Sequence, residues 1–100
     1  MPIFPLKLEA SYFNNGFFNV RRDYDRYVRR AEGPIRLRLG SNGIEVEAKL
    51  SRHANRNGTP RIFGGVPLRD WFQQHFDLMD TVSVDLSSED VLVLDRMGTS

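Results

Sequence analysis

The stretch Ile35–Leu50, IRLRLGSNGIEVEAKL, indicates which class of fold this chain adopts. Apolar and charged side chains alternate along Ile35–Leu39 and again along Ile44–Leu50, and Asn42-Gly43 lies between the two runs. Strict alternation is typical of half-buried strands, and Asn-Gly between two such runs is a strong hairpin signal. The stretch therefore predicts a β-hairpin that turns at Asn42-Gly43.

Pairing across this hairpin would account for its charged residues. A turn at Asn42-Gly43 puts Arg38 opposite Glu47, with Glu45 diagonal to it. However, Glu47-Ala48-Lys49 also matches the E-x-K triplet of magnesium-dependent nucleases, in which the Glu binds the metal and the Lys steadies the attacking water. Because the preceding strand supplies no acid to complete a metal cage, the nuclease stays an alternative.

A strongly basic segment, Arg52–Arg61, follows the hairpin. It contains three arginines, one histidine and two asparagines, and it contains no acid. The planar fork of arginine matches guanine edges and phosphate oxygens, and an asparagine amide both donates and accepts, as an adenine edge requires. A loop of this composition either binds a polyanion or is a solvated surface.

The net charge of +1 conceals an uneven distribution along the chain. Residues 1–61, the basic half, hold 12 of the 14 Lys and Arg and 6 of the 13 acids, a net charge of +6. Residues 62–100, the acidic half, sum to −5. If the halves stay apart in space, this dipole orients the basic half toward a polyanion.

Length and composition exclude several classes of function. One hundred residues are enough for a single domain with a modest core, and the absence of cysteine excludes disulfides and thiol-based sites. No apolar run reaches membrane-spanning length, so we expect a soluble, cytoplasmic protein. No nucleophile elbow or Walker lysine is present. We therefore expect residues 1–100 to form one domain without catalysis, cofactor or metal of its own.

The flanking sequence predicts further strands and two short helices. Pro5 places the strand Ile3–Leu8 at a sheet edge or a bulge. Asn15-Gly16 between aromatic runs predicts a second hairpin within Tyr12–Asn19, and helical spacing of tyrosines predicts a helix over Arg22–Ala31. Further strands are expected over residues 61–63, 81–86 and 91–94, and a second helix over residues 66–76.

The order of these elements resembles the DNA-binding pseudobarrel, the fold of plant B-three transcription-factor domains and of the effector domains of EcoRII-like restriction endonucleases. The resemblance covers residues 3–95 and is most specific in Leu68–Val84, which reads L-R-D-W-F-x-x-x-F-x-L-x-D-x-V-x-V. Met79-Asp80 stands where the family usually has Gly-Asp. The resemblance implies a mainly β (α+β) fold: a seven-stranded open β-barrel with two short helices, which grips double-stranded DNA with two arms in the major groove.

By this resemblance, the first arm is Asn14–Arg22 and the second arm is Arg52–Arg61. The expected readers of base edges are Arg52, Asn55, Arg56 and Asn57 in the second arm and Asn19, Arg21 and Asp23 in or beside the first. The expected phosphate contacts are Arg61, Lys49, Arg22 and His53. Asn14 and Asn15 complete the predicted DNA-binding set.

The sequence thus leads us to expect sequence-specific binding of duplex DNA, without catalysis. The resemblance to restriction enzymes implies a target-recognition or effector domain, covalently linked to a nuclease domain in a larger restriction endonuclease. One alternative is a small magnesium-dependent nuclease that uses Glu47 and Lys49. Another is a single-strand or RNA-binding module that stacks bases on Phe17, Phe18 and Phe63.

Overall fold

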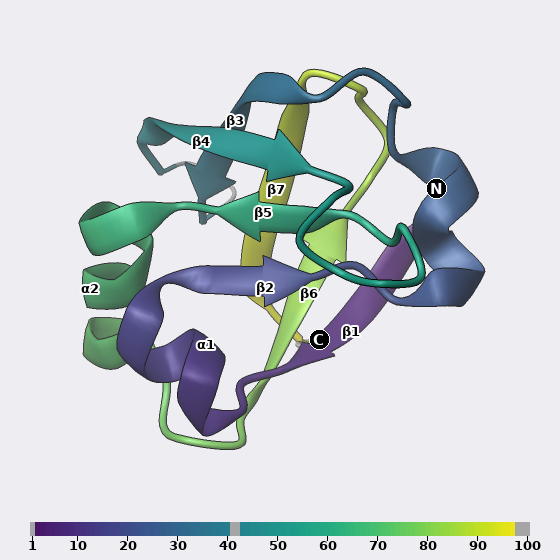
Figure 1. The fold of residues 1–100 in the computed structure, drawn as a ribbon. Coiled ribbons are helices and arrows are strands. Elements are labelled where there is room, and N and C mark those ends of the chain that lie inside the picture. The colour runs from purple at the N-terminus through teal and green to yellow at the C-terminus, as the bar shows by residue number, and fades with distance from the viewer. Residues whose placement is uncertain (1, 41–42, 98–100) are drawn as a thin grey trace.

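A computed structural model describes residues 2–40 and 43–97, and in this part of the chain one seven-stranded sheet curls around the core (Figure 1). The elements, in chain order, are β1 (Ile3–Lys7), α1 (Ala10–Asn15), β2 (Phe17–Asn19), the 3-10 helix η1 (Arg22–Tyr27), β3 (Gly33–Leu39), β4 (Glu45–Ser51), β5 (Arg61–Phe63), α2 (Gly65–His75), β6 (Thr81–Asp85) and β7 (Val91–Arg96). The strand order is β1-β6-β7-β3-β4-β5-β2, and β3 pairs with β7 in parallel. The predicted fold class is confirmed: the protein is mainly β, a mixed half-barrel with a few short helices.

Alternation along the strands supplies the core. Successive side chains of a strand point to opposite faces, so one side chain in two enters the interior. Helix α2 closes one end of the half-barrel, because Leu68 and Phe72 are completely buried and Trp71 packs against Phe76 with 5.1 Å between ring centroids. The predicted second helix is thereby confirmed. No helix in residues 2–40 and 43–97 is long and apolar enough to cross a membrane.

The hairpin of β3 and β4 is present, but its predicted register is wrong. Arg38 lies opposite Glu45, with 2.7 Å between Nη2 and Oε2, and Glu47 lies opposite Arg36. The backbone N–H of Leu39 donates to the carbonyl of Ile44 (3.0 Å), whereas a two-residue turn at Asn42-Gly43 would have paired Ile44 with Ser41. The resulting shift of two residues leaves each side chain on its expected face. Asn42 lies outside the described residues.

The hairpin predicted at Asn15-Gly16 is also wrong. Residues Ala10–Asn15 form helix α1, and Gly16 ends this helix in the left-handed region at φ 73°, its N–H donating to the carbonyl of Tyr12. Glycine at a positive φ is as favourable after a helix as inside a hairpin turn, so the same dipeptide suits both structures. Strand β2 nevertheless begins at Phe17, as expected.

The predicted helix over Arg22–Ala31 is shorter than expected. It is a single 3-10 segment, η1, which ends before Val28. Val28 is buried, and Tyr24 packs on Phe4 with 5.3 Å between ring centroids, so these contacts hold η1 against the core. Tyr27, one of the tyrosines whose spacing predicted this helix, is 37% exposed.

The elements divide between the two ends of the half-barrel (Figure 1). Helices α1 and α2 lie together at one end, where the carbonyl of Gly16 accepts from the N–H groups of Gly64 (2.9 Å) and Gly65 (3.0 Å). Helix η1 and the connection between β4 and β5 lie at the opposite end. The second arm, Arg52–Arg61, therefore lies at the end opposite to α1 and α2.

Candidate nucleic-acid interface

Arg52 ties the start of the second arm to η1. Its side chain is only 10% exposed, and its Nη2 donates to the carbonyls of Val28 (2.9 Å) and Arg29 (3.0 Å). Its Nη1 pairs with the carboxylate of Asp25. Because these groups occupy the guanidinium, the geometry favours a structural role for Arg52, and base reading by this residue stays a prediction.

Glu32 makes a second tie between the second arm and the chain that follows η1. Its carboxylate accepts from the backbone N–H of Arg52 (2.7 Å) and lies 2.8 Å from Nδ1 of His53. The hydrogen bond from the Arg52 backbone, helped by His53, holds the pKa of Glu32 below its ordinary value. The imidazole of His53 is 87% exposed, so it remains accessible to a ligand.

Asn19, Asn55 and Arg61 join the two arms directly. The Oδ1 of Asn19 accepts from Nε of Arg61 (2.8 Å) and from Nδ2 of Asn55 (3.0 Å). Nη2 of Arg61 donates to Oδ1 of Asn55 (3.1 Å) and completes a triangle of hydrogen bonds. Asn19 ends β2, Arg61 begins β5, and the two residues are direct partners in the sheet. The fold therefore brings Asn19 together with two predicted site residues that lie 36 and 42 positions away in sequence.

Two phenylalanines hold Arg61 on the outer face of the sheet. Its guanidinium carbon lies 4.7 Å from the ring centroid of Phe17 and 5.9 Å from that of Phe63, within the range of cation–π attraction. Phe63 is 39% exposed, whereas Phe18 is completely buried. The expectation that Phe18 stacks a base is therefore wrong, because the alternation of β2 turns its side chain into the core.

Arg56 is the exposed cation of the second arm. The loop around it is fixed by its own contacts: Oδ1 of Asn57 accepts from the hydroxyl of Thr59 (2.7 Å), and the N–H of Gly58 donates to the carbonyl of Asn55 (3.1 Å). Within the described part of the chain, Arg56 makes no hydrogen bond or ion pair, and its side chain is exposed. It is thus available to a ligand on a loop of defined shape.

The predicted first arm is divided by β2. Asn14 and Asn15 belong to α1, at the helical end, and Nδ2 of Asn15 donates to the carbonyl of Ser11 (2.9 Å). Arg21, Arg22 and Asp23 follow β2 at the other end. An unpredicted helix thus places the two asparagines before the strand, and the structure does not bring the whole predicted first arm together at one end.

Exposed charges follow β2 at the end that carries the second arm. Arg21 and Asp23 form a weak pair, 3.3 Å apart, in which both side chains remain more than half exposed. Arg22 is exposed and has no partner among the residues that the structure describes. These side chains are free to contact a ligand together with Arg56.

Lys49 lies on the outer face of β4, opposite Phe63 of β5. Glu47 shares this face, but it is exposed and lies opposite Arg36. Among residues 2–40 and 43–97, no group of three His, Cys, Asp or Glu is placed to hold a metal ion. The E-x-K triplet thus gains no further ligand from the described residues.

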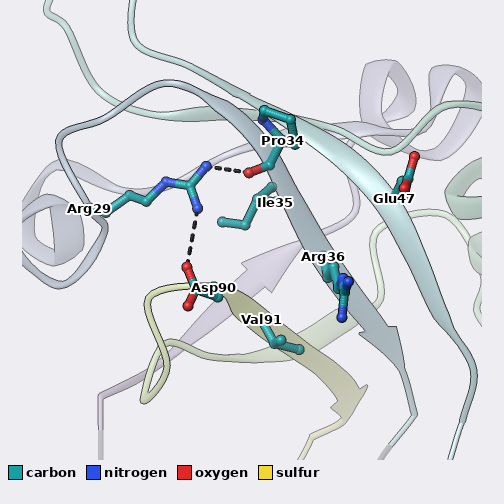
Figure 2. A pocket seen from close by; sticks show the side chains of 7 residues that line it. All are labelled: Arg29, Pro34, Ile35, Arg36, Glu47, Asp90 and Val91. Atoms are coloured by element: carbon teal, nitrogen blue, oxygen red, sulfur yellow. Dashed lines mark hydrogen bonds and ion pairs between the residues drawn. The ribbon is translucent and has the colours of Figure 1, made fainter.

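A pocket of about 410 Å³ opens beside the starts of β3 and β7 (Figure 2). It is lined by Arg29, Pro34, Ile35, Arg36, Glu47, Asp90 and Val91. Figure 2 shows Arg29 directed at the carbonyl of Pro34 and at Asp90, whose Oδ1 is 3.4 Å from Nη1 of Arg29. This ion pair joins the basic half to the acidic half, so the two halves touch at this end and are not fully separated.

The acids that anchor the second arm, Asp25 and Glu32, were not among the predicted site residues. They are two of only six acids in residues 1–61. An acid surrounded by arginines in sequence is a candidate ion-pair partner for one of them. This composition is the signal that could have identified the two acids. Nothing in the sequence indicated which arginine each acid would bind.

Comparisons with known proteins support the fold. No protein-family model matches the sequence, and a search of curated proteins finds no significant match. Among solved structures, the chain is similar to the N-terminal domain of Helicobacter pylori LlaJI.R1, with a TM-score of 0.67 and 11% identity over 95% of this chain and 79% of that chain. At this identity the similarity extends to the fold alone.

Proposed function

We propose that this chain is a sequence-specific binder of double-stranded DNA that places its two arms in the major groove. The observation that carries the proposal is the hydrogen bonding of Asn19 to Arg61 and Asn55, which joins two segments distant in sequence at one end of the half-barrel. Arg21, Arg22 and Arg56 are exposed there. Exposed arginines bind phosphates without regard to sequence, and a bidentate guanidinium reads guanine, so one such surface supports both affinity and specificity.

We divide the predicted contacts into three groups. All six of the following side chains are exposed; we assign base reading to Arg21, Asp23 and Arg56, and phosphate contact to Arg22, Lys49 and His53. Asn19, Asn55, Asn57 and Arg52 make hydrogen bonds within the protein. We propose that the residues of this last group fix the shape of the surface. They would contact bases only through donors and acceptors that are not already used within the protein.

A restriction setting is the finer part of the proposal. The name LlaJI.R1 has the form used for restriction enzymes, and the similar region is the N-terminal domain of that protein. By analogy, this chain would recognise the target for a covalently linked nuclease domain and would have no catalysis of its own. The analogy rests on the shared fold.

Selection of bound duplexes from a random pool tests this proposal. We expect a consensus sequence that is bound at least about a thousandfold more tightly than a scrambled duplex, the lower end for specific binders. We also expect log K to fall by about 0.9 per phosphate contact for each unit of log salt. Equal binding to every duplex would contradict sequence reading, and affinity that is indifferent to salt would contradict polyanion binding.

One observation favours a second function, the binding of single strands. Phe63 is 39% exposed beside Phe17, and Lys49 lies opposite it in the sheet. An aromatic ring next to a cation can stack a base and hold its phosphate. Phe63→Ala should then weaken single-strand binding more than duplex binding. Tighter binding of the wild-type protein to single strands than to duplexes would favour this function over sequence-specific duplex binding.

The nuclease alternative has a direct test as well. Incubation of plasmid DNA with the protein and Mg²⁺ should leave the DNA intact. Cleavage that is abolished both by EDTA and by Glu47→Gln would replace the proposed binding function with catalysis at the E-x-K triplet. The isosteric Glu-to-Gln change keeps the shape of the exposed side chain while it removes the charge that a metal requires.

A further inference from the structure

We infer that Arg61 is a positioning residue that fixes the two arms relative to each other. This inference rests on the proposed DNA-binding function, and it assigns to Arg61 a role other than the phosphate contact expected from the sequence. Its consequence is that DNA specificity depends on the shape of the Arg61 side chain and not only on its charge.

The hydrogen bonds of Arg61 go to both arms at once. Nε donates to Asn19, the last residue of β2, and Nη2 donates to Asn55 in the second arm. The two asparagines are also bonded to each other, at 3.0 Å. Two donors at fixed spacing in one plane are a property of the guanidinium, which an ammonium group cannot reproduce.

The surroundings of Arg61 hold this plane in place. The rings of Phe17, on the neighbouring strand β2, and of Phe63, on β5 itself, lie within cation–π range. The Nδ2 of Asn19 donates to the hydroxyl of Tyr12 (3.1 Å). Asn55 also donates to the carbonyl of Thr59 (3.1 Å). In the described part of the chain no carboxylate neutralises Arg61, so its hydrogen bonds run to neutral amides.

The joined residues adjoin the exposed cations of both arms. Asn55 immediately precedes Arg56, and Asn19 lies two residues before Arg21. A contact to a base edge requires its side chain to be held within about 0.5 Å of the productive position, and residues behind it supply that precision. Loss of the Arg61 hydrogen bonds should therefore loosen both Arg56 and Arg21, although these bonds go to Asn19 and Asn55 and not to either arginine.

The variant Arg61→Lys separates positioning from charge. We expect it to keep the salt dependence of duplex binding but to lose about tenfold in discrimination between the selected duplex and single-base variants. We also expect faster amide hydrogen exchange in residues 53–59 of the free protein. Arg96→Lys is the matched control, because Arg96 ends β7, whose neighbours in the sheet, β3 and β6, belong to neither arm; it should change none of the three.

Several outcomes would overturn the inference. One is wild-type discrimination in Arg61→Lys, since charge alone would then suffice. Another is unchanged exchange in residues 53–59, which counts against the inference whether or not the protein binds DNA. Because the exchange needs no DNA, failure of the proposed function, seen as no duplex binding by the wild-type protein, is distinguished from failure of this inference.

A second variant distinguishes loss of the Arg61 contact from misfolding of β5. Arg61 begins β5, so its replacement could disturb the strand, whereas Asn55→Ser removes the acceptor from the loop and leaves β5 intact. Asn55→Ser should reproduce the loss of discrimination and the faster exchange. Its combination with Arg61→Lys should add little, because both substitutions break the same contact. Additive losses in the double variant would contradict a shared network.

Discussion

Arg52 donates from Nη2 to the carbonyl of Val28 at 2.9 Å. This bond joins two residues that lie 24 positions apart in sequence, one at the start of the second arm and one directly after η1. The same guanidinium pairs with Asp25. An arginine that composition marks as a DNA contact is therefore engaged in holding the loop that displays another arginine, Arg56.

Loss of the Arg52 side chain should destabilise the protein. Arg52→Ala leaves the carboxylate of Asp25 and two part-buried carbonyls without this partner, at a cost of about 2–3 kcal/mol in the free energy of unfolding. Urea denaturation measures this cost. Arg56→Ala, the matched control on the same loop, should stay within about 0.5 kcal/mol of the wild-type protein. Equal effects of the two substitutions would show that Arg52 is no anchor.

The close approach of α1 to α2 should make Gly16 intolerant of a side chain. A Cβ at Gly16 would lie 2.1 Å from the carbonyl oxygen of Gly65, whereas a Cβ at Gly58 would meet nothing within 4 Å. Both glycines have positive φ, 73° and 77°, so Gly58→Ala measures the backbone strain alone, about 1–2 kcal/mol. Gly16→Ala should cost at least about 1 kcal/mol more, the scale of overpacking. Thermal melts that rank them in the other order would contradict this packing.

Helix α2 offers a comparison between two neighbouring aromatic residues. Phe72 is completely buried, whereas Trp71 is only partly buried. Phe72→Ala should therefore cost about 3–5 kcal/mol, and Trp71→Ala should cost less. Equilibrium unfolding of both variants decides the order. A larger loss in the free energy of unfolding for Trp71→Ala would mean that the tryptophan, and not Phe72, contributes most to closing the half-barrel.

Acid should weaken the tie made by Glu32. Its folded-state pKa lies below the ordinary value of 4.5, so the stabilisation that it contributes is complete above that value and is lost as the pH falls through the lowered pKa. Glu32→Gln should unfold with a flatter pH dependence in this acidic range. Parallel pH profiles for the variant and the wild-type protein would contradict the contribution of Glu32.

The fold class was predictable because its signals are local. Alternation in Ile35–Leu39 and Ile44–Leu50 specifies two strands whatever surrounds them, and the apolar spacing around Phe72 specifies α2. The errors arose where one local signal suits two structures. Asn15-Gly16 fits a helix end as well as a hairpin, and β3 and β4 can be paired in two registers that bury the same face.

The candidate site was predictable in composition but not in roles. The excess of arginine marked the right segments, and Asn19, Asn55 and Arg61 do meet. Their bonds to one another depend on the pairing of β2 with β5, which are separated by three other elements in the chain. Similarly, Arg52 and Arg56 look alike in sequence. Only the position of Asp25 in space distinguishes an anchor from an exposed contact.

Binding of Arg56→Ala to the selected duplex and to its single-base variants, each at several salt concentrations, tests the account most directly. If Arg56 reads a base, the variant should lose about 1–3 kcal/mol on the selected duplex and lose discrimination at one base pair, while the protein stays folded. If Arg56→Ala binds every duplex as the wild-type protein does, at every salt concentration, the second arm is a solvated loop and the proposed function is contradicted.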